Sequence, residues 1–297
     1  MHVVIFYDQA QDKRVHIVQS LIQKHGCEVN TFLCDELWLQ NKYQNPVAFL
    51  NKGTHFLFIL EDEPLNIQAF IFYSGFAIGR ALPVLLLTSS VTINLPNILN
   101  HFVVTLGITS FESYFIKEKA RFESEVEKNF ARQTLLDKGY AVFDSNFVLA
   151  VQNNELDIVE LFLKAGFQPN TCDALGTPVL SLAVRDSLHD MAKLLVSAGA
   201  NVNQVSKDRK YSPLMDAVQI GDFVNTNLLL QHAANPDLQS EDGQTALILA
   251  VGRQDKQLVA ILMKYGADPA IKDKLGMSAL KYAEVFGKQD ILKVLKR

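Results

Sequence analysis

The sequence contains few cysteines and lacks the patterns that mark the commonest catalytic and metal sites. Its three cysteines, Cys27, Cys34 and Cys172, are odd in number and do not have the spacing of metal ligands. There is no Gly-x-Ser-x-Gly elbow, no zinc motif and no glycine loop that would cradle a phosphate. We therefore expect no disulfide framework, no metal and no cofactor.

An excess of charge of either sign is also missing. The formal net charge of the 297 residues is −4, and it is shared almost evenly by the two halves of the chain. This balance argues against binding to nucleic acid or to an anionic membrane surface. The chain begins with an apolar, strand-like run and has no basic segment typical of a signal peptide, so we expect a cytoplasmic protein in a reducing compartment.

One long apolar run is interrupted. Residues 67–88 are mostly apolar, but Arg80 and Pro83 lie within them. An arginine near the middle of a membrane helix is costly, and a proline ends a helix. We therefore interpret the run as a buried helix followed by a buried strand, and not as a membrane span.

The second half of the chain repeats with a fixed period. Alanines recur at steps of 33, 34, 33 and 33 residues, at Ala150, Ala183, Ala217, Ala250 and Ala283. Pairs of residues close the apolar stretches in phase with this ladder, namely Ala165-Gly166, Ala198-Gly199, Ala233-Ala234 and Tyr265-Gly266. A period of this length indicates stacked units that bury their apolar sides only against one another.

The residues inside the period indicate the kind of unit. Ser212, Thr245 and Ser278 are each followed by proline or alanine and then by leucine, which predicts helices capped by these hydroxyls. A second apolar helix follows, and the closing pair predicts its left-handed cap. The pattern resembles the ankyrin-repeat family, with its Thr-Pro-Leu-His-x-Ala helix start and Gly-Ala-(Asp/Asn)-x-Asn turn. Gly199-Ala200-Asn201-Val202-Asn203 follows that turn closely, whereas no helix start carries the histidine.

The resemblance implies an all-α ankyrin solenoid over residues 143–297. We predict five units, of which the first and the last are degenerate caps. The three fuller repeats begin near Asp173, Lys207 and Ser240, and the last unit covers residues 273–297. Ankyrin arrays usually bind other proteins, so the resemblance implies a protein partner.

The first 142 residues have a different pattern. Continuous apolar runs such as residues 56–60 indicate strands that are buried on both faces of a parallel sheet. We therefore predict a three-layer α/β domain of about five parallel strands over residues 1–142, closed by an amphipathic helix over residues 111–138. The expected strands cover residues 3–7, 28–33, 55–61, 84–88 and 102–106, and further helices cover residues 12–25 and 64–82.

Acidic residues follow two of these strands. Asp8 comes after the first strand, and Glu61, Asp62 and Glu63 come at the end of the third. Open α/β sheets bind ligands at the carboxyl ends of their strands, so these residues are weak catalytic candidates. A second interpretation stays open, in which they cap the helices that follow.

A short segment near the middle of this domain resembles an enzyme family. The sequence Tyr73-Ser74-Gly75-Phe76-Ala77-Ile78-Gly79-Arg80-Ala81-Leu82-Pro83-Val84 is similar to a segment of nucleoside 2-deoxyribosyltransferases and, more loosely, of TIR-like domains. In those enzymes a glutamate opens the segment and meets positive charge at the anomeric carbon of a ribosyl group. Here the position is Tyr73, and a phenol with a pKa near ~10 is a poor replacement.

We therefore expect that the α/β domain keeps the fold but has lost the reaction. The alternative is an N-glycosidase or deoxyribosyltransferase that acts on a nucleoside or NAD-like substrate. In that case the α/β domain binds a nucleotide-like small molecule, and the ankyrin array is a targeting arm. A third, structural interpretation makes the domain only a cap for the first repeat.

Our main prediction is a protein-binding strip on the solenoid. In ankyrin arrays partners usually contact the β-turn fingertips and the exposed ends of the first helices. Carried onto this sequence, the strip consists of Leu175, Arg185, Asp208, Arg209, Tyr211, Gln219, Ile220, Asp242, Gln244, Arg253, Leu275 and Met277. It combines charges with large apolar side chains, a composition typical of protein interfaces.

Overall fold

The computed structural model describes residues 1–7, 13–33, 51–59, 74, 77–78, 80–87 and 103–296. The chain divides into two compact units, Met1–Val126 and Glu127–Arg297. The acidic candidates of the first unit, most of the predicted helix over residues 64–82 and the segment between the second and third strands lie outside the described residues.

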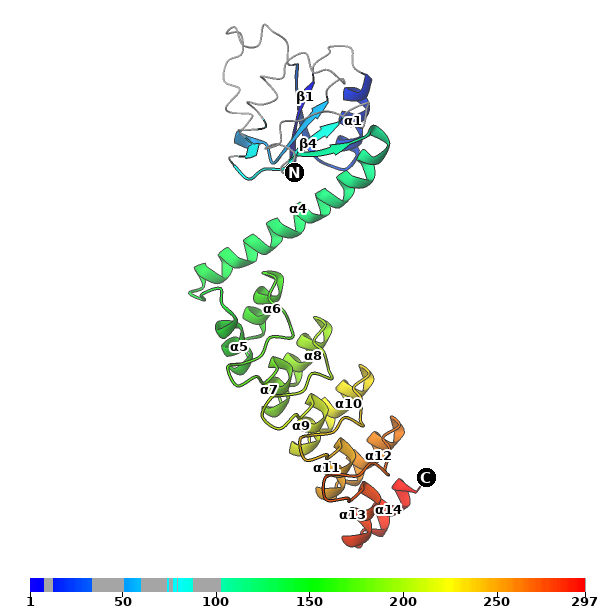
Figure 1. The fold of residues 1–297 in the computed structure, drawn as a ribbon. Helices are drawn as coiled ribbons and strands as arrows, with labels where there is room; N and C mark the ends of the chain where they lie inside the picture. Colours follow the sequence, from blue (N-terminus) through cyan, green and yellow to red (C-terminus); the bar gives the residue numbers. More distant parts are fainter. Residues whose placement is uncertain are drawn as a thin grey trace. The chain divides into compact units, whose positions relative to one another are not determined.

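The first unit is built on a parallel sheet (Figure 1). Its five strands are β1 (His2–Tyr7), β2 (Glu28–Leu33), β3 (His55–Ile59), β4 (Val84–Leu87) and β5 (Val103–Leu106). They lie in the order β2-β1-β3-β4-β5, and every neighbouring pair is parallel. The predicted parallel α/β architecture is confirmed.

Burial on both faces explains why these strands are so apolar. All residues of β3 and β4 are buried, in agreement with their continuous apolar sequences. On one face, Ile5, Leu57 and Leu85 form a core with the helices α1 (Lys13–Lys24) and α4 (Ile108–Asp137). Val18 of α1 and Phe115 of α4 are among the residues that cover this face.

The helix α4 contributes to both units, because the division falls within it. Its first turns carry Phe111 and Phe115 into the core of the sheet. Ala131 and Leu135, near its end, are buried in the core of the second unit. The last turns of α4 therefore cover the apolar side of the first repeat, which a solenoid end requires.

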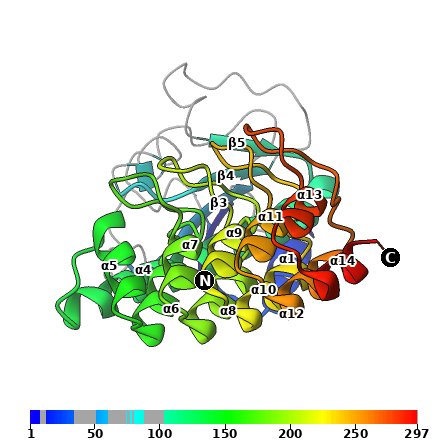
Figure 2. The same ribbon diagram turned by 90° about the horizontal axis from the view of Figure 1, so that it is seen from below.

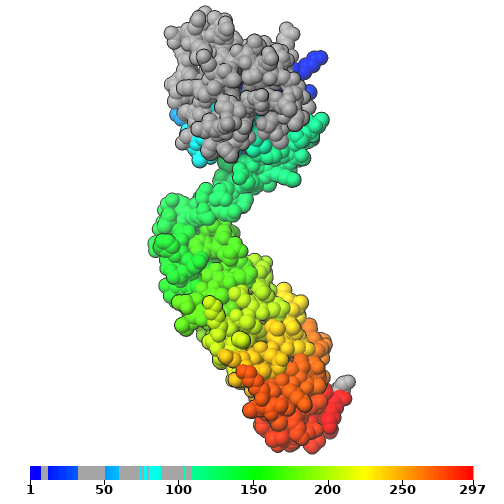
Figure 3. Space-filling model, in the orientation of Figure 1, coloured from blue at the N-terminus to red at the C-terminus, as the bar shows by residue number. Residues whose placement is uncertain are grey.

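The second unit is a stack of helix pairs. The first helices of the pairs are α5 (Asp144–Gln152), α7 (Val179–Arg185), α9 (Pro213–Ile220), α11 (Ala246–Gly252) and α13 (Ala279–Val285). The second helices are α6 (Leu156–Lys164), α8 (His189–Ser197), α10 (Phe223–Gln231), α12 (Lys256–Lys264) and α14 (Gln289–Leu295). First helices contact first helices and second helices contact second helices, so the pairs form two rows (Figure 2). The pairs pack as one continuous body from green to red in Figure 3.

The predicted helix caps are confirmed in this unit. Ser212, Thr245 and Ser278 each accept a hydrogen bond from the backbone N–H three residues later. Gly166, at the end of α6, has φ of 97° and makes the expected left-handed turn. In the third unit Ala233 stands in the place of the glycine and is left-handed as well, with φ of 62°.

Candidate functional site

A β-turn, here called a finger, connects each helix pair to the next. The first and the last finger are held by the same two hydrogen bonds. Asp173 Oδ1 accepts hydrogen bonds from the backbone N–H groups of Leu175, at 2.9 Å, and Thr177, at 2.7 Å. Asp273 makes the same two bonds at the last finger, both at 3.0 Å. Successive fingers are also joined by backbone hydrogen bonds, such as Lys274 N–H to the Asp242 carbonyl at 2.9 Å. The fingers therefore form a continuous edge of the array.

A buried ion cluster lies between the second and third repeats. Asp216 occupies the position, one residue before the alanine ladder, that holds leucine in the neighbouring repeats, at Leu182 and Leu249. Its carboxylate accepts a hydrogen bond from Arg185 Nε at 3.0 Å and lies 3.6 Å from an Arg209 nitrogen. The side chain of Asp216 is only 1% exposed. Two consecutive repeats are thus joined through one buried carboxylate.

Burial dominates the electrostatics of this carboxylate. Desolvation raises the pKa of Asp216 above its ordinary value, although the charge of Arg185 and its hydrogen bond act in the opposite direction. Arg209 is half exposed and also covers the ring of Tyr211, with 4.4 Å between the guanidinium carbon and the ring centre. Tyr211 itself is buried, at 8% exposure. Its ring forms part of the wall of the array and not a free fingertip.

A pocket of about 430 Å³ opens beside this cluster. It lies on the row of first helices, and its lining comes from three successive repeats. The lining residues are Tyr211, Gln219, Gln244, Ile248, Leu249, Gly252, Arg253, Tyr282 and Phe286. Apolar and aromatic walls with a few polar groups are typical of a site that accepts one large side chain.

One of the repeats lacks a side chain at this pocket. Two residues after the alanine ladder, the other repeats carry Gln152, Arg185, Gln219 and Val285, whereas the fourth carries Gly252. A Cβ atom added to Gly252 would have no heavy atom within 4 Å. The backbone of Gly252 is not in the left-handed region, so the glycine is not needed for the turn.

Arg253 provides the charge at this pocket. Its Nη1 donates a hydrogen bond to the Gln219 carbonyl at 2.7 Å, which holds the guanidinium over the preceding repeat. No carboxylate among the described residues forms an ion pair with Arg253, whereas Arg185 and Arg209 are both paired with Asp208 and Asp216. Arg253 is therefore an exposed guanidinium available to an acidic group.

Only some residues of the predicted strip lie together at the pocket. Tyr211, Gln219, Gln244 and Arg253 line the pocket. Leu175 and Leu275 lie on fingers and are 76% and 81% exposed. The remaining members do not line it: Asp208, Arg209, Ile220 and Asp242 are exposed, and Arg185 and Met277 are half-buried.

Sequence reasoning missed some of the residues that form the pocket and the ion cluster. Tyr282 and Phe286 were not in the predicted strip, and neither was Asp216. Phe286 is 40% exposed and its ring lies 5.9 Å from that of Tyr282. Aligning the repeats on the alanine ladder would have shown the missing side chain at residue 252 and the carboxylate at residue 216.

The catalytic candidates of the first unit are not tested by these contacts. Asp8, Glu61, Asp62, Glu63 and Tyr73 lie outside the described residues. Within the described part of the chain, no group of three or more His, Cys, Asp or Glu side chains is arranged to hold a metal ion. Across the same residues, no helix combines the length and apolarity that a membrane crossing requires.

Comparison with known proteins agrees with the helix stack. The family model for ankyrin repeats, which describes three copies, matches residues 147–239 and 214–297. The chain belongs to the ankyrin-repeat family. The resemblance predicted for the second half is therefore confirmed, and an ankyrin array implies a protein partner.

The relatives differ in how much of the chain they share. An ankyrin repeat-containing protein of Treponema pallidum (strain Nichols) is 42% identical over 287 residues, which is 96% of each chain. An ankyrin repeat protein of fowlpox virus is 30% identical over 161 residues, 51% of this chain and 47% of the viral one. The B-cell lymphoma 3 protein homolog of mouse is 35% identical over 98 residues, 33% of this chain and 22% of the mouse protein. The Treponema protein thus shares most of the first unit as well as the ankyrin array.

Proposed function

We propose that this protein binds a partner protein through the first-helix row and the fingers of its ankyrin array, and that the α/β unit has no catalytic role. The observation that carries the proposal is the pocket at Gly252. The packing of the repeats does not require an open pocket of this kind. An interface in which one side chain of the partner is buried as an anchor does require such a pocket.

The lining indicates what the partner presents. Ile248 and Leu249 are almost fully buried, while Phe286 is 40% exposed at the rim. A leucine or aromatic side chain from the partner would cover this surface and exclude water from it. Arg253 then favours an aspartate or glutamate next to that anchor, because its guanidinium has no acidic partner among the described residues.

Filling the pocket tests this function. The substitution Gly252→Leu places a side chain in the vacancy and replaces a helix residue of poor propensity with a good one, so the array should remain folded. Partners captured from a lysate by the unaltered protein should be lost from the variant by at least about tenfold, as expected for blocking an anchor. The matched control is Ala260→Leu on the second-helix row, where residue 260 is exposed.

The two variants separate the outcomes. If Gly252→Leu abolishes capture and Ala260→Leu does not, the first-helix row is the interface. If Ala260→Leu abolishes capture instead, the partner lies on the second-helix row and the proposal is wrong. Thermal unfolding of both variants shows that neither loss comes from misfolding.

A second candidate function is supported by the strand order. In a sheet ordered 2-1-3-4-5, ligands bind where the order reverses, at the carboxyl ends of β1 and β3. These strands pair in parallel, with Tyr7 opposite Ile59 at their ends. In the sequence, Asp8 follows β1 directly and Glu61 follows two residues after β3. This placement supports the N-glycosidase or deoxyribosyltransferase alternative, with a nucleoside or NAD-like substrate.

Product release distinguishes this candidate from the first. The purified protein is incubated with nucleosides and with NAD, and free base is measured. We expect none, because the position of the family's glutamate is Tyr73. Release of base that disappears in Asp62→Asn would establish the enzyme and overturn the first assignment of the α/β unit.

A further inference from the structure

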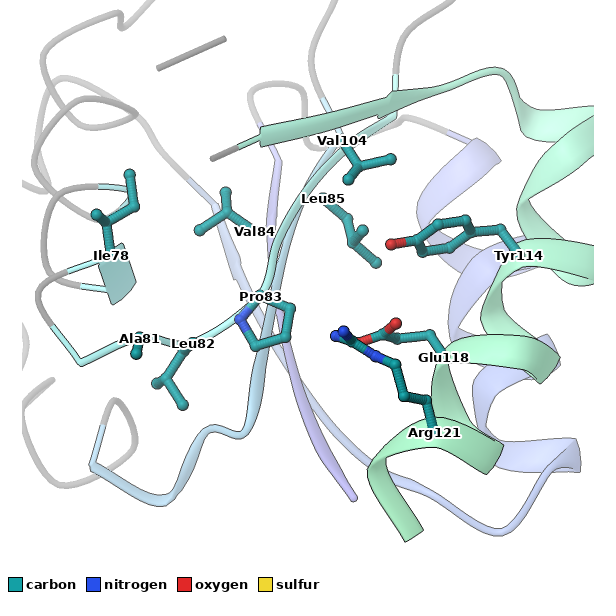
Figure 4. A pocket seen from close by; sticks show the side chains of 10 residues that line it. All are labelled: Ile78, Ala81, Leu82, Pro83, Val84, Leu85, Val104, Tyr114, Glu118 and Arg121. Carbon is teal, nitrogen blue, oxygen red and sulfur yellow. The ribbon is translucent and has the colours of Figure 1, made fainter. Parts of the chain in front are cut away.

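The first unit contains a cavity that neither proposed function uses. Its volume is about 550 Å³, within the usual range of small-molecule sites. It lies where β4 begins, which is the edge of the sheet opposite to the carboxyl ends of the strands. Figure 4 shows the side chains of the described residues that line it: Ile78, Ala81, Leu82, Pro83, Val84, Leu85, Val104, Tyr114, Glu118 and Arg121.

The two sides of the cavity have different chemistry. The start of β4 and the residues just before it provide an apolar wall, with Pro83, Val84 and Leu85 at its centre. Val104 on β5 extends this wall and is 40% exposed. Such a surface would bind an aliphatic or aromatic group by removing it from water.

Among the described residues of the lining, the polar side chains all come from α4. Tyr114, Glu118 and Arg121 are spaced four and three residues apart, so they lie on one face of the helix. Figure 4 shows the three polar ends pointing into the cavity toward Pro83 and Val84. Arg121 donates a hydrogen bond to Glu118 Oε1 at 2.6 Å. An anionic and a cationic group are thus presented side by side.

Glu118 makes a second contact, with a buried histidine. The residue is only 6% exposed, and its Oε1 also lies 3.3 Å from Nε2 of the fully buried His55. Burial lowers the pKa of His55, although Glu118 opposes this effect, so the imidazole is neutral at pH 7 and does not cancel the charge of the carboxylate. No described residue donates a hydrogen bond to Glu118 Oε2. That oxygen remains as an acceptor for a ligand.

The charge of Arg121 is accessible in the same place. Its side chain is 71% exposed, and its hydrogen bond to Glu118 uses one of five N–H groups. The remaining N–H groups can bind a carboxylate. The hydroxyl of Tyr114 makes no hydrogen bond to a described residue and is therefore also available.

We infer that this cavity binds a free α-amino acid with an apolar side chain. The ligand's ammonium group would bind Glu118 Oε2 and the Tyr114 oxygen, and its carboxylate would bind Arg121. The two charges of an α-amino acid are separated by one carbon atom, which matches the adjacent carboxylate and guanidinium of the site. Its side chain would lie on Val84, Leu85 and Pro83. The ligand is neutral overall, as is the Glu118 and Arg121 pair.

Calorimetric titration of the full-length protein with single amino acids tests the inference. L-leucine, L-methionine and L-phenylalanine should bind, and L-glutamate and L-lysine should bind at least about tenfold more weakly because the apolar wall cannot pair their charges. Two analogues of leucine isolate the charged contacts. 4-Methylpentanoate lacks the ammonium group and 3-methylbutylamine lacks the carboxylate, and each should lose at least about tenfold in affinity.

Variants of α4 assign the contacts to residues. Arg121→Gln and Glu118→Gln should each weaken leucine binding by at least about tenfold, and Tyr114→Phe by a smaller factor. Arg121 is exposed, so its variant should fold even where Glu118→Gln disturbs the contact with His55. Glu123→Gln is the matched control, because Glu123 lies on the same helix, pairs with Lys119 and does not line the cavity.

Several results of these measurements would contradict the inference. Absence of binding by all three apolar amino acids at millimolar concentration would overturn the inference. Equal binding of leucine and of either analogue would show that the charged pair does not recognise the ligand. A full loss of affinity in Glu123→Gln, or unchanged affinity in Arg121→Gln, would place the ligand elsewhere.

Discussion

Arg185 and Asp216 belong to consecutive repeats and are joined by a hydrogen bond of 3.0 Å, from Nε of the arginine to Oδ1 of the aspartate. The carboxylate stands where the neighbouring repeats have a leucine, Leu182 or Leu249. Its other oxygen, Oδ2, is buried and has no hydrogen-bond partner among the described residues. Removing a charged group from water costs free energy unless its hydrogen bonds compensate for the lost hydration. We therefore expect the pair to have a measurable effect on the free energy of unfolding.

We predict that the double substitution Asp216→Leu with Arg185→Leu stabilises the array at pH 7 by about 1 kcal/mol or more, because it replaces a buried ion pair with apolar side chains and leaves neither charge without its partner. The pKa of Asp216 is raised in the folded protein by burial. A raised carboxyl pKa favours folding at low pH, and this contribution is lost as the pH rises through the folded pKa. The advantage of the variant should therefore grow as the pH is raised from about 4 toward 7.

Denaturant unfolding of both proteins across this range provides the measurement. Other carboxylates titrate in both proteins, so the difference between them isolates residue 216. A variant that is less stable than the parent at pH 7 would show that the ion cluster contributes net stability to the array.

Asp273 should show the opposite dependence on pH. Burial is the largest influence and would raise its pKa, but hydrogen bonds from the Tyr282 hydroxyl, at 2.6 Å, and from the N–H groups of Met277 and Leu275 together hold the pKa below its ordinary value. A lowered carboxyl pKa adds stability above the unfolded value of about 3.9, and this stability is lost as the pH falls through the folded pKa.

Replacing the carboxylate with an amide removes this contribution. We predict that Asp273→Asn costs about 1 kcal/mol at pH 7, as expected for weakening charge-assisted hydrogen bonds. The cost should shrink as the pH is lowered toward 3, below the ordinary pKa. Chemical unfolding at several pH values measures it, with Glu284→Gln as the control because Glu284 pairs only with Lys281 at the surface. A cost that stays constant with pH would show that the charge of Asp273 is unimportant.

The fold of the array was predictable because its determinants are local. The hydroxyl caps at Ser212, Thr245 and Ser278 and the left-handed cap at Gly166 depend on residues within one turn of each other, and the periodicity fixes how the units stack. In the third unit the left-handed cap falls on Ala233, where alanine replaces the usual glycine and the repeat period, not the residue type, indicates the position.

The candidate site was less predictable because it depends on contacts between repeats. Tyr211 was expected on the surface, but it is buried, and the guanidinium of Arg209 lies over its ring. The pocket requires Phe286 from one repeat, Gln219 from another and the absence of a side chain at Gly252. The cavity of the first unit also combines distant segments, since Val84 and Glu118 meet only when α4 packs on the sheet.

The end of α4 should be essential for the stability of the first repeat. Leu135 is fully buried in the same core as Phe147 and Phe162, whereas the adjacent Leu136 is 51% exposed. We predict that Leu135→Ala lowers the free energy of unfolding of the array by about 2–5 kcal/mol and that Leu136→Ala has an effect within about 0.5 kcal/mol. Denaturant unfolding followed by far-ultraviolet circular dichroism compares them, and equal costs would mean that the helix end does not cover the repeat.

Two glycines in the fingers, Gly243 and Gly276, have similar backbone conformations but different surroundings. Gly243 and Gly276 have φ values of 78° and 75°, so alanine at either position costs about 1–2 kcal/mol through the left-handed backbone. A Cβ on Gly243 would lie 3.0 Å from the backbone nitrogen of Lys274, whereas on Gly276 it would meet nothing within 4 Å.

We therefore predict that Gly243→Ala destabilises the array by about 1 kcal/mol more than Gly276→Ala, as expected when a close backbone contact must shift. The closeness at Gly243 comes from the hydrogen bond between the Lys274 N–H and the Asp242 carbonyl that joins the two fingers. Thermal unfolding of the two variants under one set of conditions measures the difference. Equal melting temperatures would show that the fingers are free to separate, and that the continuous edge they form is too weak to resist a single methyl group.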